Sequence, residues 1–353
     1  MMKVYVDGAD NIGWHVDVER QHLQDTLRRI GIREVPDPLK ADIVHNVWWD
    51  SFILNRTRLE RVLLRFKRNT IVTASNFVNI DDPKYDRRSL FNVIKKYARA
   101  WVAPSLKQKR LFDKQGIACF YQPFFLDLRL FYPLRDEISK DDLAHEFGIP
   151  KEIYKNRVMI GSYQRDSEGK DLKRPKWQKD PDLLIDILRD LPKHAFVLLL
   201  AGPRRHYVIS KCKEHSIPYW YVGTETTDDD LRHNAVDVLL MPKLYALLDL
   251  YLVTSRSEGG PKAVMEATAT RTPIMSTNVG IAEDFLDRHN VFDDTDDYKK
   301  AVHDFVLHNK ADIHTARVEE QYKICKNILG QDAMDRRLKD IYANVRKIKA
   351  VFT

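Results

Sequence analysis

Short apolar runs alternate with amphipathic stretches along the first part of the chain. The apolar runs predict strands over residues 3–7, 41–47, 69–75 and 99–105. Between them, apolar residues recur at helical spacing and predict helices over residues 15–30, 59–68 and 89–98. Strands that alternate with helices are typical of the doubly wound α/β class, in which helices cover both faces of a parallel sheet.

Residues 120–137 interrupt this alternation with two prolines, which predicts the exit from a first domain and a linker. The pattern then restarts, with strands predicted over 157–162, 195–202, 219–223, 249–255 and 272–280. Helices are predicted over 181–191, 206–216, 229–248, 261–270 and from about 313 onward. Two successive Rossmann-like units imply a cleft, and ligands of such sheets bind at the carboxyl ends of the strands.

The chain carries a net charge of +7, which suits an anionic partner. The positive charge is spread, with its densest stretches at 56–69, 165–179 and 336–349. The first and last combine charge with helical apolar spacing, which is typical of a solvated helix face. Peripheral contact with a membrane surface is the alternative interpretation of these two stretches.

Three cysteines, Cys119, Cys212 and Cys325, lie far apart in no paired spacing. This argues against a disulfide framework and a cysteine-ligated metal, and it favours a reducing compartment. The N-terminus lacks a signal-peptide pattern, and no apolar run approaches the ~18 residues of a membrane-spanning helix. We therefore expect a cytoplasmic protein.

The stretch that carries chemistry is 249–280, which predicts a strand, a glycine turn, a helix and a second strand. Gly259 and Gly260 let the backbone approach a ligand, and Pro261 suits the first helical position. The free amides of a helix N-terminus form an anion site. Glu258 precedes those amides and Glu266 lies on the second turn of the helix, so the pair can reach one ligand at two points.

Glu258 and Glu266 are separated by seven residues, and Gly-Gly-Pro follows the first. This stretch resembles the signature of family 4 retaining glycosyltransferases (glycosyl transferases group 1), which have the GT-B fold. The resemblance implies two Rossmann-like domains that face each other across a cleft: an acceptor domain at 1–135 and a nucleotide-sugar donor domain at 136–325. It also implies that a helical segment at 326–353 packs back on the first domain.

The resemblance also assigns roles to residues of the donor site. Glu258 is expected beside the donor sugar, Glu266 at the ribose hydroxyls, and the amides of Gly259 and Gly260 at the diphosphate or sugar. Pro261 and Lys262 complete the donor-binding turn.

The stretch from residue 160 resembles the family's first donor-domain strand and loop, where a basic pair neutralises the diphosphate. By position the pair is Arg165 and Lys179, but the loop is longer than usual, so Lys170 and Lys176 are alternatives to Lys179. Residues 198–205 resemble the second strand, with Gly202 and Arg204 at its turn. Tyr221 lies in the strand beside which the base usually sits.

The acceptor side departs from the family's pattern. Where many members have a histidine near the reacting carbon, this chain has Asn76, and His45 and His15 are nearby alternatives. Gly13 and Trp14 follow the first strand at a position expected to face the acceptor.

The resemblance implies transfer of a sugar with retention, from a UDP-, GDP- or ADP-sugar to a glycan, lipid-linked or small-molecule acceptor. Arg165 and Lys179 would stabilise the leaving diphosphate without a metal, and Glu258 the charge on the sugar. The acid-x-acid pattern at 228–230 would suit a metal, but acids are also favoured at the start of the helix predicted there. We therefore expect neither a metal nor a cofactor.

Two other interpretations fit parts of the sequence. One is a non-catalytic nucleotide- or nucleic-acid-binding α/β protein that exploits the positive charge, and the other is a further GT-B activity such as a sugar-nucleotide epimerase. A nucleic-acid interface predicts a basic stripe interleaved with aromatics. Here the charge is scattered and two glutamates occupy the predicted anion site, so no nucleic-acid partner is expected.

Overall fold

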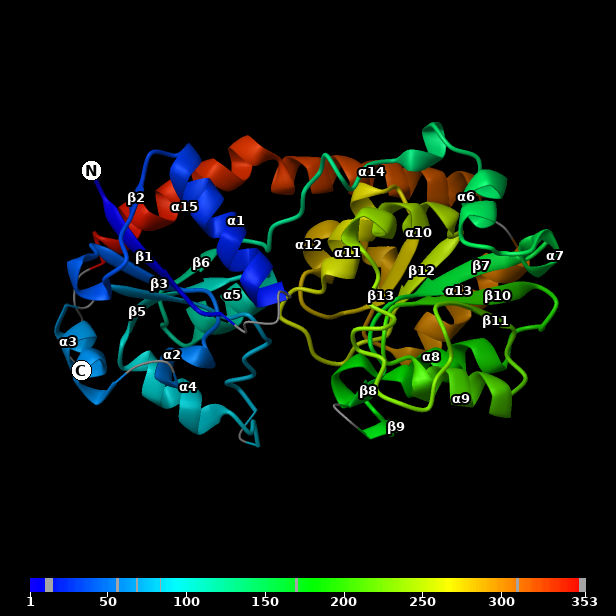
Figure 1. The fold of residues 1–353 in the computed structure, drawn as a ribbon, viewed down its shortest axis with the longest axis horizontal. Helices are drawn as coiled ribbons and strands as arrows, with labels where there is room; N and C mark the ends of the chain where they lie inside the picture. Colours follow the sequence, from blue (N-terminus) through cyan, green and yellow to red (C-terminus); the bar gives the residue numbers. More distant parts are fainter. Residues whose placement is uncertain are drawn as a thin grey trace. The chain divides into compact units, whose positions relative to one another are not determined.

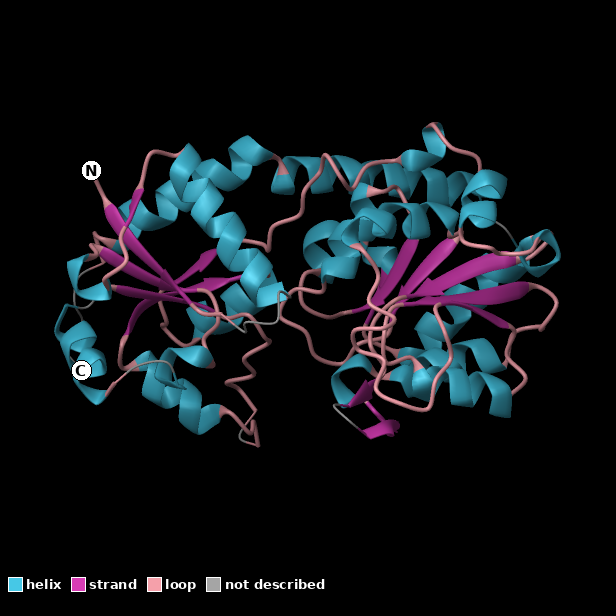
Figure 2. Ribbon diagram, in the orientation of Figure 1, coloured by secondary structure: helices cyan, strands magenta, loops and turns pink. Residues whose placement is uncertain are grey.

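The computed structural model describes residues 1–9, 15–54, 57–67, 69–82, 84–168, 171–308 and 311–348. The chain divides into two compact units, residues 1–125 with 328–353 and residues 126–327. Each unit contains a six-stranded parallel sheet with helices on both of its faces (Figures 1 and 2).

The first unit has the strand order β2-β1-β3-β4-β5-β6. Its strands are β1 (Lys3–Asp7), β2 (Arg33–Glu34), β3 (Ile43–Asn46), β4 (Thr70–Thr73), β5 (Ala98–Ala103) and β6 (Cys119–Tyr121). Its helices are α1 (His15–Arg29), α2 (Ser51–Leu54), α3 (Arg58–Lys67), α4 (Arg88–Lys95), α5 (Leu106–Lys114) and α15 (Gln331–Val345).

Side chains that alternate along the strands divide the core of this unit into two layers. Trp101 of β5 packs in one layer with residues of α2, α4 and α5. Its neighbour Val102 packs in the other with residues of α1 and α15. The returning helix α15 places Leu338, Ile341, Tyr342 and Val345 in that layer. The last helix of the chain is therefore part of the first unit's core.

The second unit has the strand order β11-β10-β7-β12-β13-β14. Its strands are β7 (Val158–Ser162), β10 (Phe196–Ala201), β11 (Tyr219–Val222), β12 (Leu250–Val253), β13 (Ile274–Thr277) and β14 (Val291–Phe292). Helices α8 (Pro181–Arg189), α9 (His206–Glu214) and α13 (Thr295–His308) pack on one face. Helices α10 (Met241–Leu247), α11 (Lys262–Ala269) and α14 (Ala311–Leu329) lie on the other side of the sheet (Figure 1). The short helices α6 (Lys140–Glu146), α7 (Lys151–Tyr154) and α12 (Ala282–Phe285) complete the unit.

No helix in the described part of the chain is long and apolar enough to cross a membrane.

One local prediction is wrong, and one local element was missed. The helix predicted over 229–248 is irregular until a 3-10 turn at Val238–Leu240, and only α10 is helical. The helix begins late because the Asp237 side chain caps that turn and Pro242 fits the first turn of α10. Within the loop at 165–179, an antiparallel hairpin of β8 (Ser167–Glu168) and β9 (Asp171–Pro175) was not predicted.

Gly161 lies in β7, the strand on which the second sheet is centred. A Cβ built on it would meet the Leu248 side chain at 2.2 Å. No side-chain rotation at residue 161 relieves such a contact, because the Cβ position is set by the backbone. Glycine at this position therefore lets the segment after α10 pack directly on β7.

We expect Gly161→Ala to lower the free energy of unfolding by about 1–3 kcal/mol, the usual cost of overpacking a core. Chemical denaturation monitored by circular dichroism measures this loss. The double variant Gly161→Ala/Leu248→Ala should lose less than the sum of the two single variants, because the shortened side chain makes room for the added methyl group. Strict additivity would contradict the proposed clash.

Candidate functional site

The strand order of the second unit reverses between β7 and β12, and the loops that follow these two strands diverge there. Ligands of open α/β sheets bind at such a point, outside the carboxyl ends of the strands. Glu258 lies in the loop after β12 and forms an ion pair with the Lys179 ammonium. The Ser255 hydroxyl donates a 2.8 Å hydrogen bond to the same carboxylate. The structure therefore brings together two of the predicted catalytic residues.

A short 3-10 turn, Trp177–Lys179, holds Lys179 at this edge of the sheet. Main-chain amides of Arg256 and Ser257 donate to the Gln178 carbonyl, at 2.9 and 3.4 Å. The Arg256 guanidinium donates to both carboxylate oxygens of Asp180. Asp180 has φ 45°, and its side chain caps α8. Sequence reasoning missed Arg256 and Asp180, because no local pattern indicates that they pair.

Two basic side chains, Arg165 and Lys179, are close enough to Lys176 to influence its ionisation. Burial, then the proximity of Arg165 and Lys179, lowers the pKa of Lys176 to about 8, while Glu258 opposes this shift. Burial and the nearby Arg204 lower the pKa of Arg165. The Lys176 ammonium forms no hydrogen bond or ion pair with another described residue. Arg165, Lys179, Glu258 and Glu168 therefore all lie close enough to Lys176 to act on its charge.

Glu266 lies on α11, and its carboxylate accepts a 2.8 Å hydrogen bond from the Tyr245 hydroxyl. Burial raises the pKa of Glu266, while this hydrogen bond and Lys262 oppose the rise. Tyr245 packs against Tyr163 and Tyr251, with ring centroids 5.4 and 5.1 Å away. Tyr245 precedes Glu266 by 21 residues, so only the tertiary structure identifies it as the partner.

Gly259 and Gly260 separate Glu258 from the helix. Neither has a positive φ, so their backbone conformation does not require glycine.

Gly280, which the sequence analysis did not assign to the site, has a positive φ of 52°, and a Cβ there would approach the Glu258 carbonyl to 3.0 Å. Pro261 is the N-cap of α11 rather than its first helical residue. The first amides of α11, which have no acceptor further back within the helix, therefore follow directly after Pro261.

The turn after β10 carries Gly202 and Arg204, with φ of 83° and 57°. The Arg204 guanidinium donates to both oxygens of Asp229, at 2.9 and 2.7 Å, and its amide donates to Asp230 at 2.8 Å. The Tyr221 hydroxyl donates to the Gly202 carbonyl at 2.9 Å. The carboxylates of Asp229 and Asp230 therefore hold this turn. The sequence had predicted that they would start a helix.

Among the described residues, no group of three or more His, Cys, Asp or Glu side chains is arranged to hold a metal ion.

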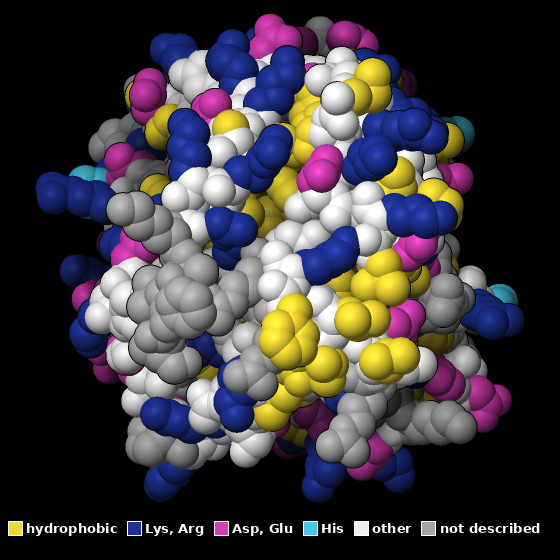
Figure 3. All heavy atoms as spheres, turned by 90° about the vertical axis from the view of Figure 1, so that its left-hand side faces the viewer, with side chains coloured by type: hydrophobic (Ala, Val, Ile, Leu, Met, Phe, Trp, Pro, Cys, Tyr) yellow, Lys and Arg dark blue, Asp and Glu magenta, His cyan; other side chains and the backbone are white. Residues whose placement is uncertain are grey.

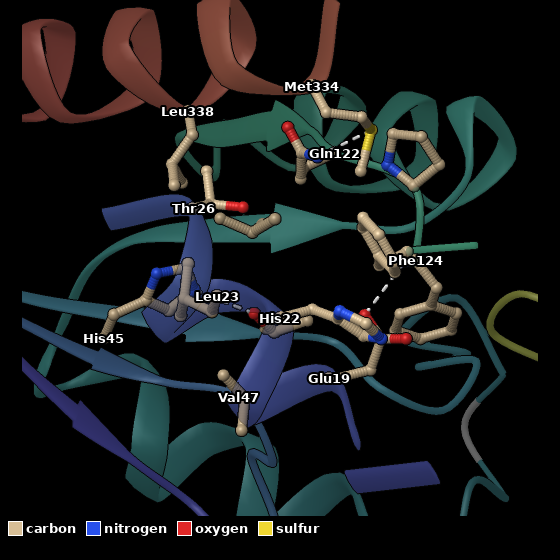
Figure 4. Close-up of a pocket in the computed structure, with 14 residues that line it drawn as sticks. Glu19, His22, Leu23, Thr26, His45, Val47, Gln122, Phe124, Met334 and Leu338 are labelled. Atoms are coloured by element: carbon tan, nitrogen blue, oxygen red, sulfur yellow. Dashed lines mark hydrogen bonds between the residues drawn. The ribbon is translucent and has the colours of Figure 1, made fainter. Parts of the chain in front are cut away.

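The first unit contains a cavity of about 70 Å³ between α1, α15 and the carboxyl ends of its strands (Figure 4). His45 lies in its wall, with Nδ1 2.9 Å from the Tyr342 hydroxyl and Nε2 3.0 Å from the Thr73 hydroxyl. Burial lowers the pKa of His45 to about 4, so the imidazole is neutral near pH 7. The His22 ring stacks on Phe125 at 3.6 Å between centroids.

Of the other residues predicted on the acceptor side, Asn76 is the one whose side chain the structure describes. Asn76 is exposed in the loop after β4 and is not part of the cavity wall. His15 is the first residue of α1, but its side chain is not described. Gly13, Trp14 and Lys170 lie outside the described residues.

Solved structures share this fold over nearly the whole chain. Anabaena HepE in complex with UDP and glucose has a TM-score of 0.69 at 11% identity, over 98% of this chain and 100% of that one. Sucrose-phosphate synthase from Thermosynechococcus elongatus has a TM-score of 0.70 at 12% identity, over 99% and 100%. A glycosyltransferase from Rickettsia africae has a TM-score of 0.65 at 14% identity, over 99% of both chains.

The fold is therefore GT-B, as the sequence resemblance implied. Residues 172–321 match the family described as glycosyl transferases group 1. This domain carries Lys179, Glu258 and Glu266, and the enzyme class predicted from the sequence, a glycosyltransferase, is confirmed. No curated protein sequence matches the chain.

Proposed function

We propose that this enzyme transfers a sugar from a nucleoside-diphosphate sugar to a hydroxyl acceptor with retention of configuration and without a metal. The observation that carries the proposal is the placement of Glu258 at the carboxyl end of β12, paired with Lys179 and next to Arg165 and Lys176. A donor offers complementary charges: a diphosphate for the cations and a developing oxocarbenium ion for the carboxylate.

Departure of the diphosphate concentrates negative charge on its oxygens. Fixed cations stabilise that charge as it develops, and partial burial strengthens the effect because less water screens them. We assign Arg165 and Lys176 to the diphosphate, together with the amides at the start of α11. Lys179 would hold Glu258 in place beside the sugar and add to the positive potential.

Glu266 is proposed to accept hydrogen bonds from the ribose hydroxyls. Its pairing with Tyr245 fixes one carboxylate oxygen and leaves the other to bind the ligand. Gly202 and Tyr221 are proposed to line the nucleotide site near the base. Arg204 contributes through the turn that it stabilises, since its guanidinium is engaged by Asp229.

The acceptor is proposed to bind at the first unit, which we assign as the acceptor domain. The cavity beside His45 has room for roughly two water molecules, so it would take a small substituent of an acceptor and not a whole sugar. Gly13, Trp14, His15 and Asn76 stay predictions for this side, as do the domain boundaries at 135 and 325.

UDP-sugars are the first donors to test, because two of the similar solved structures hold UDP with glucose and UDP-glucose. We expect UDP, GDP or ADP to raise the thermal unfolding temperature in the presence of EDTA. A ligand at 100 times its dissociation constant adds about 2.7 kcal/mol. Glu266→Ala should abolish the shift, because it removes the proposed ribose contact. Differential scanning fluorimetry measures both effects.

The matched control is Glu214→Ala, on the exposed surface of α9, which should keep the full shift. If no nucleotide stabilises the wild-type protein, or if Glu266→Ala responds like the control, the proposed donor site is wrong.

Binding of the diphosphate should depend on pH through Lys176. The protonated ammonium attracts the anion, and with a pKa of about 8 in the free protein, the proton is lost as the pH rises above that value. Affinity should be constant from pH 6.5 to about 7.5 and then fall by up to about tenfold per pH unit. Isothermal titration calorimetry with UDP, GDP and ADP measures the profile.

Lys176→Arg should keep its affinity at high pH, because a guanidinium stays charged. Lys176→Met should bind weakly at every pH, with no decline above pH 8. Lys173→Met, on the exposed side of β9, is the matched control and should behave as wild type. A wild-type profile in Lys176→Met would exclude this role while leaving the nucleotide site intact.

The anomeric configuration of the product tests retention directly. With an α-linked donor, proton NMR of the first turnovers should show an α-linked product, formed at an unchanged rate with EDTA. A β-linked product would show inversion, and loss of rate with EDTA would show a metal requirement. Conversion of the donor to an epimer without any acceptor would favour the epimerase alternative.

A further inference from the structure

Helix α3 presents an apolar surface to solvent. Leu59, Val62, Leu63 and Phe66 recur at the spacing of one helix face, and their exposed fractions are 68%, 41%, 38% and 80%. On its inner side the helix places Leu64 in a small cluster with Val35, Ala41 and Val44. Surface helices normally turn their apolar stripe toward the core. A group of four large exposed apolar residues therefore indicates an interaction surface.

The sequence of this segment is strongly basic. Residues 56–69 contain six Lys and Arg residues and one acid, Glu60. The Glu60 carboxylate accepts hydrogen bonds from the amide and hydroxyl of Thr57, both at 2.9 Å, and so caps the start of the helix. Figure 3 shows hydrophobic side chains gathered on this side of the unit, with Lys and Arg side chains around them.

The basic segment at 336–349 differs from α3 in the burial of its apolar face. There, α15 buries its apolar face in the core of the first unit, including Leu338 and Ile341, each 3% exposed. Its charges are therefore the solvated side of a packed helix. Only in α3 do the basic residues accompany an apolar face that is left without a partner among the described residues.

We propose that α3 docks on an anionic lipid surface, with Leu59, Val62, Leu63 and Phe66 inserted among the lipids and the positive charge of the segment attracting the headgroups. An apolar stripe flanked by Lys and Arg is suited to the interface of an anionic bilayer. A second copy of the chain fits poorly, because it would oppose one cluster of like charge with another.

The test is sedimentation with vesicles of phosphatidylcholine alone and of phosphatidylcholine mixed with phosphatidylglycerol, at low and high salt. The wild-type protein should sediment with the mixed vesicles at low salt and be released by high salt. The double variant Leu59→Ser/Phe66→Ser should lose at least about tenfold in partitioning, because it removes the two most exposed apolar side chains. Both substitutions are at exposed positions, so the variant should retain its fold and its nucleotide response.

A matched double variant, Val238→Ser/Leu239→Ser, changes residues that are 55% and 62% exposed in the second unit and should sediment as wild type. Failure of the wild-type protein to bind mixed vesicles at low salt would overturn the proposal, and so would equal losses in the two variants. If gel filtration shows self-association that only Leu59→Ser/Phe66→Ser abolishes, and vesicles have no effect, the face joins two copies and the lipid assignment is wrong.

Discussion

The ion pair between Lys179 and Glu258 joins two loops that are 79 residues apart in the chain. Both loops leave the carboxyl edge of the same sheet, and the Arg256–Asp180 pair and the amides bonded to the Gln178 carbonyl hold them together. The geometry of the proposed donor site depends on this connection. If it were lost, Glu258 would no longer have a defined position relative to the basic residues that follow β7.

The same region disfavours the charged form of Lys176 in the free protein. Burial is the main cause, and the neighbouring Arg165 and Lys179 add to it while Glu258 and Glu168 oppose it, so the pKa of Lys176 is lowered. A diphosphate bound beside Lys176 would offset this effect. Perturbed ionisation of this kind is typical of functional sites, and here it is located where the topology of the sheet places ligands.

The two basic amphipathic segments show how tertiary packing separates similar sequences. Both combine Lys and Arg with apolar residues at helical spacing. Helix α15 buries its apolar residues against the first sheet, whereas α3 leaves four of them exposed. The same local pattern therefore stabilises the core in one case and presents a surface in the other, and the difference lies in which face the neighbouring elements cover.

The sequence by itself determined the α/β class and most strands, because alternation and helical spacing are local properties. It also led to the prediction that Glu258 and Glu266 belong to the donor site, because the glycine turn between two strands is a contiguous motif. It did not reveal Tyr245 as the partner of Glu266, the Arg256–Asp180 pair or the irregular path of residues 229–237. Each of these depends on contacts with residues distant in the chain: Asp229 and Asp230 bind the turn at Arg204 and so are not available to start a helix. Only the tertiary structure decided them, because side-chain partners and the buried face of a helix are set by what packs against it.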